Sequence, residues 1–344
     1  MVYPLKKTLK SFLNTKQQEY VKNKYSQLKY TFFKPKPSEI ILDISASCNA
    51  ACPFCPRMFM DVERSKGYMS LELYMFSLEE AQKHGIKRLR LYSTAEPTLN
   101  PHFSEMIDIA KKMGFYISVS TNASMMHKHM RALLMVDQIQ FSIEGWDKES
   151  YEFYRQPLKF EKVYENIQYF NQLCFTLTQK PLRQINLLLT KETQINTFVS
   201  LWGEFCDEIH IHFMFPSSIF ESGHIVSKRP LKMEDKLYPF NTKSGRKYCS
   251  FPFEVVTVAY DGKISLCCDD FSSSFALGNI KEGIQNIFFS STLNEVRQQF
   301  ITQQLVICQE CNIFLSPLAE DVKQVKEELL RVNVPKNIRI VFDY

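Results

Sequence analysis

Short runs of β-branched and aromatic residues alternate with longer amphipathic stretches between residues 39 and 213. The short runs are largely apolar, which is typical of strands that are covered on both faces of a sheet. Six strands separated by helices predict a parallel α/β sheet, either doubly wound or a partial barrel. The predicted strands cover residues 39–44, 88–92, 115–120, 138–143, 184–189 and 208–213, and the helices between them cover 70–84, 101–113, 125–134, 160–173 and 193–205.

The pattern changes after residue 213. Residues 216–248 are rich in Ser, Lys and Pro and lack periodicity, which indicates a linker or a loop over the site. Two apolar runs around Asp261-Gly262 then predict a β-hairpin over 254–267. Helices are expected at 292–303 and 318–331, and a last strand at 337–344. The expected units are a basic helical segment (1–38), a core (39–215), the linker or active-site loop (216–248), a small unit (249–315), and a C-terminal helix and strand (316–344).

Composition narrows the class of protein. The 344 residues are 45% hydrophobic, which is enough to bury a sizeable core. We find neither an apolar run of membrane-spanning length nor a clean secretory signal, so we expect a cytoplasmic protein. In that setting the ten cysteines are expected to be reduced thiols or metal ligands rather than disulfides.

The net charge of +5 is unevenly distributed. Residues 1–38 contain nine lysines and one glutamate, whereas the rest of the chain carries 33 basic and 36 acidic side chains. Apolar residues fall at helical spacing among the first lysines, so this segment could make weak contact with an anionic membrane surface or guide an acidic substrate. It could equally pack its apolar stripe on the main domain. We expect no nucleic-acid partner.

The first cysteine cluster is Cys48-x-x-x-Cys52-x-x-Cys55, directly after the first predicted strand. Three thiolates within eight residues can hold one side of a cubane iron–sulfur cluster and leave one iron open for catalysis. The active sites of parallel α/β folds lie at this end of the strands. A zinc knuckle is the alternative, but it needs a fourth ligand, and the next histidine, His84, lies at the end of a predicted helix.

This pattern and those that follow it resemble the radical S-adenosylmethionine (radical SAM) family. The resemblance implies a partial (β/α)6 TIM-like barrel with a small C-terminal β-hairpin-plus-helix cluster-binding unit. It also implies that Cys48, Cys52 and Cys55 hold a catalytic [4Fe-4S] cluster whose open iron binds S-adenosylmethionine. Phe54 occupies the aromatic position that the family places beside the adenine.

Further elements at the strand ends match the family's order. Glu96, in Ser93-Thr94-Ala95-Glu96-Pro97, is expected to face the SAM amino group, although Thr94 and Ala95 stand where glycines are usual. The resemblance places Ser142 and Glu144 at the SAM ribose and Arg155 at its carboxylate, and it includes Asn122 among the cofactor contacts. Taken singly, each of these residues is also a common cap or turn residue.

The second cluster comprises Cys249, Cys267, Cys308 and Cys311. Its spacing resembles the SPASM or twitch extension of radical SAM enzymes, which implies one auxiliary [4Fe-4S] cluster with four protein ligands. Spacing alone also allows a structural zinc ribbon. Cys268 is not among these four ligands, and it could be a packed thiol or a hydrogen-atom donor.

Two more cysteines, Cys174 and Cys206, have apolar neighbours near helix ends and are expected to be core thiols. His210 and His212 alternate on one strand face, so they could act as an acid–base pair or could be solvated or hydrogen-bonded histidines without that role.

The implied activity is reductive cleavage of SAM to a 5′-deoxyadenosyl radical that abstracts hydrogen from a small-molecule substrate, a sugar-derived compound being one candidate. Oxidation and epimerisation are the expected outcomes, with a flavodoxin- or ferredoxin-type electron donor. The auxiliary cluster could accept an electron from the substrate, relay electrons or only hold its unit in place. The alternatives are a maturase of ribosomal peptides and a non-catalytic iron–sulfur or zinc protein.

Overall fold

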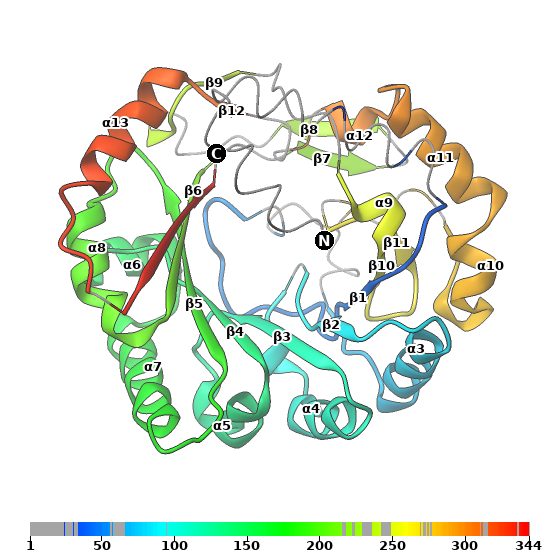
Figure 1. Cartoon of the computed structure of the whole chain (residues 1–344), viewed down its shortest axis with the longest axis horizontal. Coiled ribbons are helices and arrows are strands. Elements are labelled where there is room, and N and C mark those ends of the chain that lie inside the picture. Colours follow the sequence, from blue (N-terminus) through cyan, green and yellow to red (C-terminus); the bar gives the residue numbers. More distant parts are fainter. Residues whose placement is uncertain are drawn as a thin grey trace, which may run out of the picture.

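We describe the chain from a computed structural model (Figure 1). The structure describes residues 34–55, 57, 66–93, 95–214, 218–221, 224–228, 236–241, 249–268, 270, 273, 275, 277–309, 311, 316–335 and 337–343, together with residues 24 and 30. Most of the basic segment 1–38 and Thr94 therefore lie outside the described residues.

A nine-stranded sheet forms the centre of the molecule and curves like an incomplete barrel (Figure 1). The six predicted strands are all present and pair in parallel in chain order. The expected partial barrel is therefore confirmed, with a larger sheet than six strands. The six are β1 (Glu39–Leu42), β2 (Arg88–Arg90), β3 (Tyr116–Thr121), β4 (Gln138–Ser142), β5 (Leu182–Leu189) and β6 (Glu208–Phe213).

Alternate residues of these strands face the surrounding helices. Ile139, Phe141, Ile209 and Ile211 are fully buried, and the Phe141 ring packs edge-on against Phe170 of a helix at 5.8 Å between centroids. The residues between them are more polar and only partly buried, as along β4 and β6. The apolar core therefore lies outside the barrel, and polar side chains line its concave face.

Helices cover the outer face of the sheet (Figure 1). The Ser70 side chain accepts a hydrogen bond from the Leu73 amide at 3.2 Å and so begins the first of them. One helix, α6, was not predicted from the sequence because it has only seven residues; a capping box at Asp147 begins it. The helices are α3 (Leu71–Lys83), α4 (Phe103–Lys112), α5 (Met126–Met135), α6 (Lys148–Tyr154), α7 (Phe160–Cys174) and α8 (Ile195–Trp202), with 3-10 turns η2 (Pro97–Leu99) and η3 (Gly203–Phe205).

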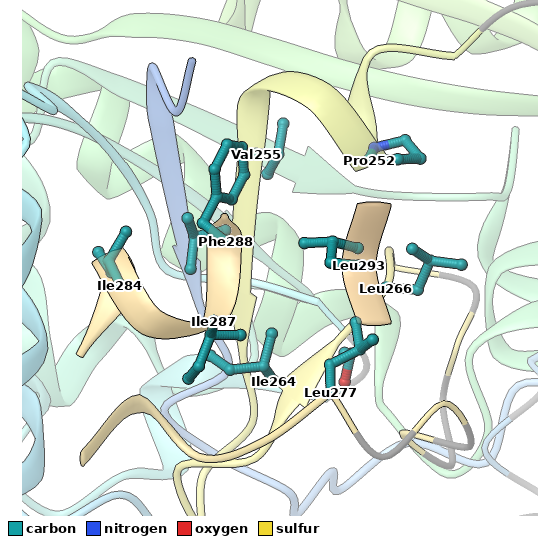
Figure 2. A pocket seen from close by; sticks show the side chains of 11 residues that line it. Pro252, Val255, Ile264, Leu266, Leu277, Ile284, Ile287, Phe288 and Leu293 are labelled. Atoms are coloured by element: carbon teal, nitrogen blue, oxygen red, sulfur yellow. The ribbon is translucent and has the colours of Figure 1, made fainter. Parts of the chain in front are cut away.

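The predicted hairpin exists, but it belongs to the main sheet. It consists of β10 (Val255–Val258) and β11 (Ile264–Ser265), and β10 also pairs in parallel with β1. Beside it, an apolar pocket is lined by residues of the hairpin and by Ile287, Phe288 and Leu293 from the following helices (Figure 2). This pocket is the hydrophobic interior of the C-terminal unit. Its helices are α9 (Phe251–Glu254), η5 (Ile280–Glu282), α10 (Ile284–Phe288), α11 (Ser291–Ile301) and α12 (Val306–Gln309).

The predicted last strand, β13 (Arg339–Asp343), pairs in parallel with β6 at the other edge of the sheet. It follows α13 (Ala319–Leu329), which lies close to the predicted 318–331. Within residues 216–248, the described stretches include a hairpin of β7 (Ser218–Glu221) and β8 (His224–Lys228), whereas β9 (Phe240–Asn241) pairs with β12 (Ser316–Pro317). In the part of the chain that the structure describes, we find no helix long and apolar enough to cross a membrane.

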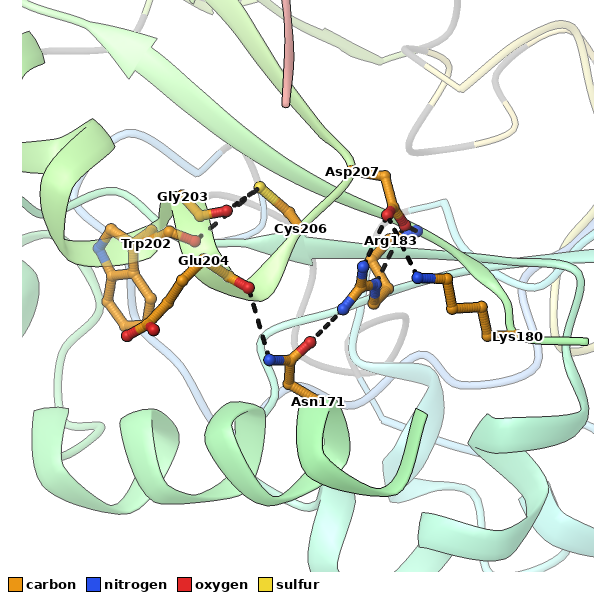
Figure 3. Close-up of polar contacts among 8 residues, drawn as sticks. All are labelled: Asn171, Lys180, Arg183, Trp202, Gly203, Glu204, Cys206 and Asp207. Atoms are coloured by element: carbon orange, nitrogen blue, oxygen red, sulfur yellow. Dashed lines mark hydrogen bonds and ion pairs between the residues drawn. The ribbon is translucent and has the colours of Figure 1, made fainter. Parts of the chain in front are cut away.

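A polar cluster joins β5, β6 and α7 at the end of the barrel where these strands begin (Figure 3). Arg183 is 3% exposed, and its guanidinium donates to Asp207 Oδ1 at 2.6 Å and to Oδ2 at 3.0 Å. The same guanidinium donates to Asn171, whose amide reaches the Glu204 carbonyl. A buried charge held in this way ties two strands to a helix.

Candidate functional site

The first cysteine cluster lies on the loop that leaves the carboxyl end of β1. Cys52 is buried, and Cys48 and Cys55 are half-buried. The Cys55 amide donates to the Cys52 carbonyl at 3.0 Å, which turns the loop back on itself. Burial raises the pKa of Cys48 and raises that of Cys52 to about 12. A thiol in this environment keeps its proton unless a metal replaces it.

Arg155 connects three of the predicted site residues. Its guanidinium donates to Cys52 Sγ at 3.4 Å, lies 5.4 Å from the centre of the Phe54 ring and forms an ion pair with Glu144. Arg155 and Glu144 are 8% and 3% exposed. Burial disfavours the charged guanidinium, but the Glu144 carboxylate raises the pKa of Arg155 above its ordinary value. The two residues that the resemblance assigns to different parts of SAM are thus paired with each other.

Glu96 lies on the neighbouring side of the cysteine loop and is fully engaged with the protein. Its Oε2 accepts from the Asn122 amide at 2.7 Å, and its Oε1 accepts from Thr121 Oγ1 at 2.7 Å and from the Thr98 amide at 3.2 Å. The Thr98 hydroxyl donates to the same Oε1. Full burial raises the pKa of Glu96 despite these donors. The carboxylate thus joins the end of β3 to the turn after β2.

Asn122 ties the cysteine loop to the end of β3. Its side-chain amide donates to Asn49 Oδ1 at 2.9 Å, and Asn49 donates in turn to Ser124 Oγ at 2.9 Å. Between Asn122 and Ser124 in the chain, Ala123 is buried and has a φ of +63°. This left-handed conformation costs a non-glycine residue free energy. The Asn166 amide donates to the Ala123 carbonyl at 2.9 Å and so holds the turn.

Ser142, at the end of β4, completes the set. Its hydroxyl lies 3.0 Å from that of Ser120 on β3. The structure therefore brings the predicted cofactor residues together around the ends of β1 to β4. Sequence reasoning missed Asn49, Thr98 and Thr121 as their partners. Asn49 lies inside the cysteine motif and Thr121 directly precedes Asn122, so only their positions offered a signal.

The second cysteine cluster surrounds a pocket in the C-terminal unit. Cys249, Cys267, Cys268, Cys308 and Cys311 all line it, together with apolar residues that include Phe300. Cys268 also interacts electrostatically with Arg90 and Tyr92 of the barrel. The predicted four ligands are thus gathered at one place, with Cys268 between them and the core. By contrast, the expected core thiols Cys174 and Cys206 are 1% and 0% exposed.

The donor sets fit iron–sulfur clusters. Both consist of thiols, the ligands that such clusters take, and a buried guanidinium donates to Cys52, which favours its anionic form. Among the residues described, no group of three Cys, His, Asp or Glu side chains is arranged to hold a metal ion, so the assignment rests on the chemistry of the thiols and on the pocket that the second set lines. Cys48, Cys52 and Cys55 would hold the catalytic cluster, and Cys249, Cys267, Cys308 and Cys311 would hold the auxiliary one.

Solved structures share this fold. Streptococcus suis SuiB bound to the precursor peptide SuiA matches with a TM-score of 0.59 at 14% identity, over 93% of this chain and 80% of that chain. BtrN in complex with AdoMet and 2-DOIA matches with a TM-score of 0.50 at 14% identity, over 81% and 94%. At these identities the likeness concerns the fold alone.

Curated relatives match part of the chain. A tungsten-containing aldehyde ferredoxin oxidoreductase cofactor-modifying protein from Pyrococcus furiosus is 27% identical over 161 residues, 44% of each chain. An S-adenosylmethionine-dependent nucleotide dehydratase from Flammeovirga pacifica is 27% identical over 162 residues, which is 44% of this chain and 55% of the relative. The chain thus spans about half the length of the curated relatives it matches.

Two family models match where the two cysteine clusters lie. The model of the radical SAM superfamily matches residues 42–178, and that of the SPASM iron–sulfur cluster-binding domain matches residues 249–312. These domains imply SAM, a [4Fe-4S] cluster and auxiliary iron–sulfur binding, as the cysteine spacing had indicated. The chain belongs to the radical SAM superfamily and carries a SPASM iron–sulfur domain.

Proposed function

We propose that this protein is a radical SAM enzyme that oxidises a small hydroxylated substrate held at the concave face of the barrel. The observation that carries the proposal is the contact of Cys52 with Arg155, which joins the cluster loop to the ends of the neighbouring strands. When bound, the clusters and SAM supply a 5′-deoxyadenosyl radical and a one-electron acceptor.

The residues of this chain orient the reactants and exclude water. Cys48, Cys52 and Cys55 would hold the catalytic cluster, Phe54 would lie beside the adenine, and Arg155 stabilises the cluster loop through its contact with Cys52. Glu96 and Asn122 hold that loop against β3, and Ser142 and Glu144 would lie at the ribose. Together the clusters and SAM supply the hydrogen-atom acceptor and the one-electron acceptor that a two-electron oxidation of an alcohol would need, and a base of this chain would take the hydroxyl proton.

A small molecule is favoured over a peptide by the character of the concave face. That face carries hydroxyl and amide side chains, among which Gln138 Nε2 donates to Gln184 and Ser142 contacts Ser120. Such groups form hydrogen bonds with compact polar ligands. We further propose a cytoplasmic enzyme with a flavodoxin- or ferredoxin-type electron donor.

Anaerobic reconstitution tests the proposed activity. The wild-type chain should bind about eight irons, four for each [4Fe-4S] cluster, and should form 5′-deoxyadenosine when given SAM and dithionite. Cys52→Ala should abolish 5′-deoxyadenosine formation. Cys174→Ala is the matched control, because Cys174 is buried in the core and should leave iron content and cleavage unchanged. Zinc at both sites, or loaded clusters without SAM cleavage, would refute the proposal.

The auxiliary cluster is tested separately. Cys308→Ala/Cys311→Ala should lower the iron content to about four per chain and stop substrate oxidation while leaving SAM cleavage intact. Product formation at the wild-type rate in this variant would show that the auxiliary cluster is not the electron acceptor.

A further inference from the structure

A network of polar side chains crosses the concave face of the sheet from β3 to β13. Ser118 Oγ donates to Gln138 Oε1 at 3.3 Å, and Gln138 contacts Gln184 on the next strand. Gln184 Nε2 then donates to Glu208 Oε2 at 2.7 Å. At the far end, Arg339 of β13 forms an ion pair with the other oxygen of Glu208. Ser118, Gln138, Gln184, Glu208 and Arg339 thus form one connected polar network on the concave face of the sheet.

His210 lies on β6, two residues after Glu208, and contacts this polar network. Its Nε2 is 2.8 Å from Glu208 Oε2, and the side chains of His210 and Glu208 are 21% and 8% exposed. Burial would raise the pKa of Glu208, but hydrogen bonds from His210 and Gln184 and the charge of Arg339 bring it below its ordinary value. A carboxylate can only accept, so the contact with Glu208 favours a proton on His210 Nε2 and leaves Nδ1 as the acceptor of the imidazole, although Gln184 Nε2 also lies 3.0 Å from His210 Nε2.

The strand register places His210 in line with the cofactor residues. Ser142 of β4 pairs with Asn186 of β5, and Asn186 pairs with His210 of β6. Neighbouring strands are about 4.8 Å apart, so His210 lies about 10 Å from Ser142 along this row. A molecule bound on the row would therefore reach from the cofactor edge to the histidine.

Asn186 indicates what such a molecule offers. Its Oδ1 is buried and has no hydrogen-bond partner, and a buried acceptor of this kind costs free energy until a donor reaches it. Asn186 and His210 are paired on neighbouring strands, so the Oδ1 acceptor of Asn186 and the imidazole of His210 belong to neighbouring side chains on one face of the sheet. Neighbouring hydroxyl groups of one ligand would satisfy both.

The charges on the same face argue against an anionic ligand. Arg90 donates to both carboxylate oxygens of Glu39 at 2.6 Å, and Arg339 is paired with Glu208. Each of these cations therefore already has a carboxylate partner. A phosphate would need to displace one of them.

We propose that Asn186 and His210 bind neighbouring hydroxyl groups of a neutral polyhydroxylated substrate, and that His210, positioned by Glu208, accepts the proton of the hydroxyl being oxidised. In that step the O–H bond breaks, the Nδ1–H bond forms and the electron pair stays on oxygen. The inference rests on the proposed function and names its substrate class and its base.

Calorimetric titration of the reconstituted, SAM-loaded, unreduced protein tests the binding site. The probes are myo-inositol, glucose and N-acetylglucosamine, each compared with its monophosphate ester. At least one neutral probe should bind, and its ester should bind about tenfold more weakly. Asn186→Leu and His210→Phe should each weaken binding about tenfold. His84→Gln, at the residue that follows the outer helix α3, is the control and should bind as the wild type does.

Imidazole nitrogen NMR tests the role of Glu208. With ¹⁵N-labelled histidine, the His210 signal is identified by its absence in His210→Gln and should show the Nε2–H tautomer. Glu208→Gln should give a mixture of tautomers, because the neutral amide can also donate to Nε2. An Nδ1–H tautomer in the wild type would refute the role of His210 as the base.

The outcomes separate this inference from the proposed function. If no neutral probe binds, if a phosphate ester binds more tightly, or if the Asn186 and His210 variants bind unchanged, the substrate site is wrong even when SAM is cleaved. If the wild type forms no 5′-deoxyadenosine with dithionite, the proposed function fails whatever the titration shows.

Discussion

At the residue scale, Arg155 has the most demanding position in the candidate site. A fully buried guanidinium requires partners, and it has Glu144, Cys52 and the face of Phe54. The cysteines could be predicted from their spacing alone, because a short loop forces them together. The pairing of Arg155 with Glu144 could not, since it depends on how two loops from different strands meet.

Removing either member of this pair should destabilise the protein. Arg155→Met leaves the buried Glu144 carboxylate unpaired, and we expect a loss of about 3–5 kcal/mol in the free energy of unfolding. The measurement is urea unfolding before cluster reconstitution. Arg155→Met/Glu144→Gln should regain most of that loss, because both charges are then absent.

An exposed pair on the neighbouring helix provides the control. Lys148 and Glu161 form an ion pair with more than half of each side chain in water, so Lys148→Met should change stability little. If the losses in the free energy of unfolding caused by the single Arg155 and Glu144 variants simply added up in the double variant, the two residues would not be coupled as a pair.

At the scale of elements, the core strands were predicted well because each contains a run of β-branched and other apolar residues, which is a strong local signal. The pairing of β10 with β1 was not predicted, since the two strands are over 200 residues apart and parallel register leaves no trace in either segment. The short helix α6 was missed for a different reason. Its seven residues include Tyr151, Phe153 and Tyr154, which show no helical period at that length.

The cluster of Arg183 and Asp207 at the opposite end of the barrel should show a pH-dependent contribution. Hydrogen bonds and charge from Arg183 outweigh burial and bring the pKa of Asp207 below its ordinary value of 3.8. The stabilisation is therefore complete above about pH 4 and is lost as the pH falls through the lowered pKa. At pH 7, Asp207→Asn should cost about 3 kcal/mol, because it leaves buried Arg183 without its partner.

Urea unfolding at pH 7 and in steps down to pH 2 measures this difference. The gap between the wild type and Asp207→Asn should close as the solution becomes more acidic. A gap that is independent of pH would show that Asp207 acts through packing rather than through its charge.

At the scale of the whole molecule, the two matched domains share one sheet. The C-terminal hairpin continues the barrel through β10, and Glu80 of α3 accepts a hydrogen bond from the Ile284 amide at the start of α10 at 3.0 Å. The sequence indicated a small unit at residues 249–315 whose cysteines would hold an auxiliary cluster. Its place in the sheet gives it a second source of stability.

Hydrogen–deuterium exchange should therefore show one cooperative body. The amides of residues 255–258 should exchange as slowly as those of residues 39–42, and calorimetry of the reconstituted protein should give a single transition. Two separate transitions, or fast exchange in β10 beside a protected β1, would show that the hairpin unfolds independently of the barrel.

The pairing of β10 with β1 also sets the order in which the chain can fold during its synthesis. At about 5–20 residues per second, the ribosome adds β10 roughly 10–40 seconds after β1. Throughout that interval one edge of β1 has backbone groups without a strand to pair with. One edge of β6 is likewise without a partner until β13 is made. An edge of this kind is a template for pairing between chains. Production of the protein should therefore be limited by association of nascent chains, and making fewer chains at once in the presence of more chaperone should raise the yield of folded protein.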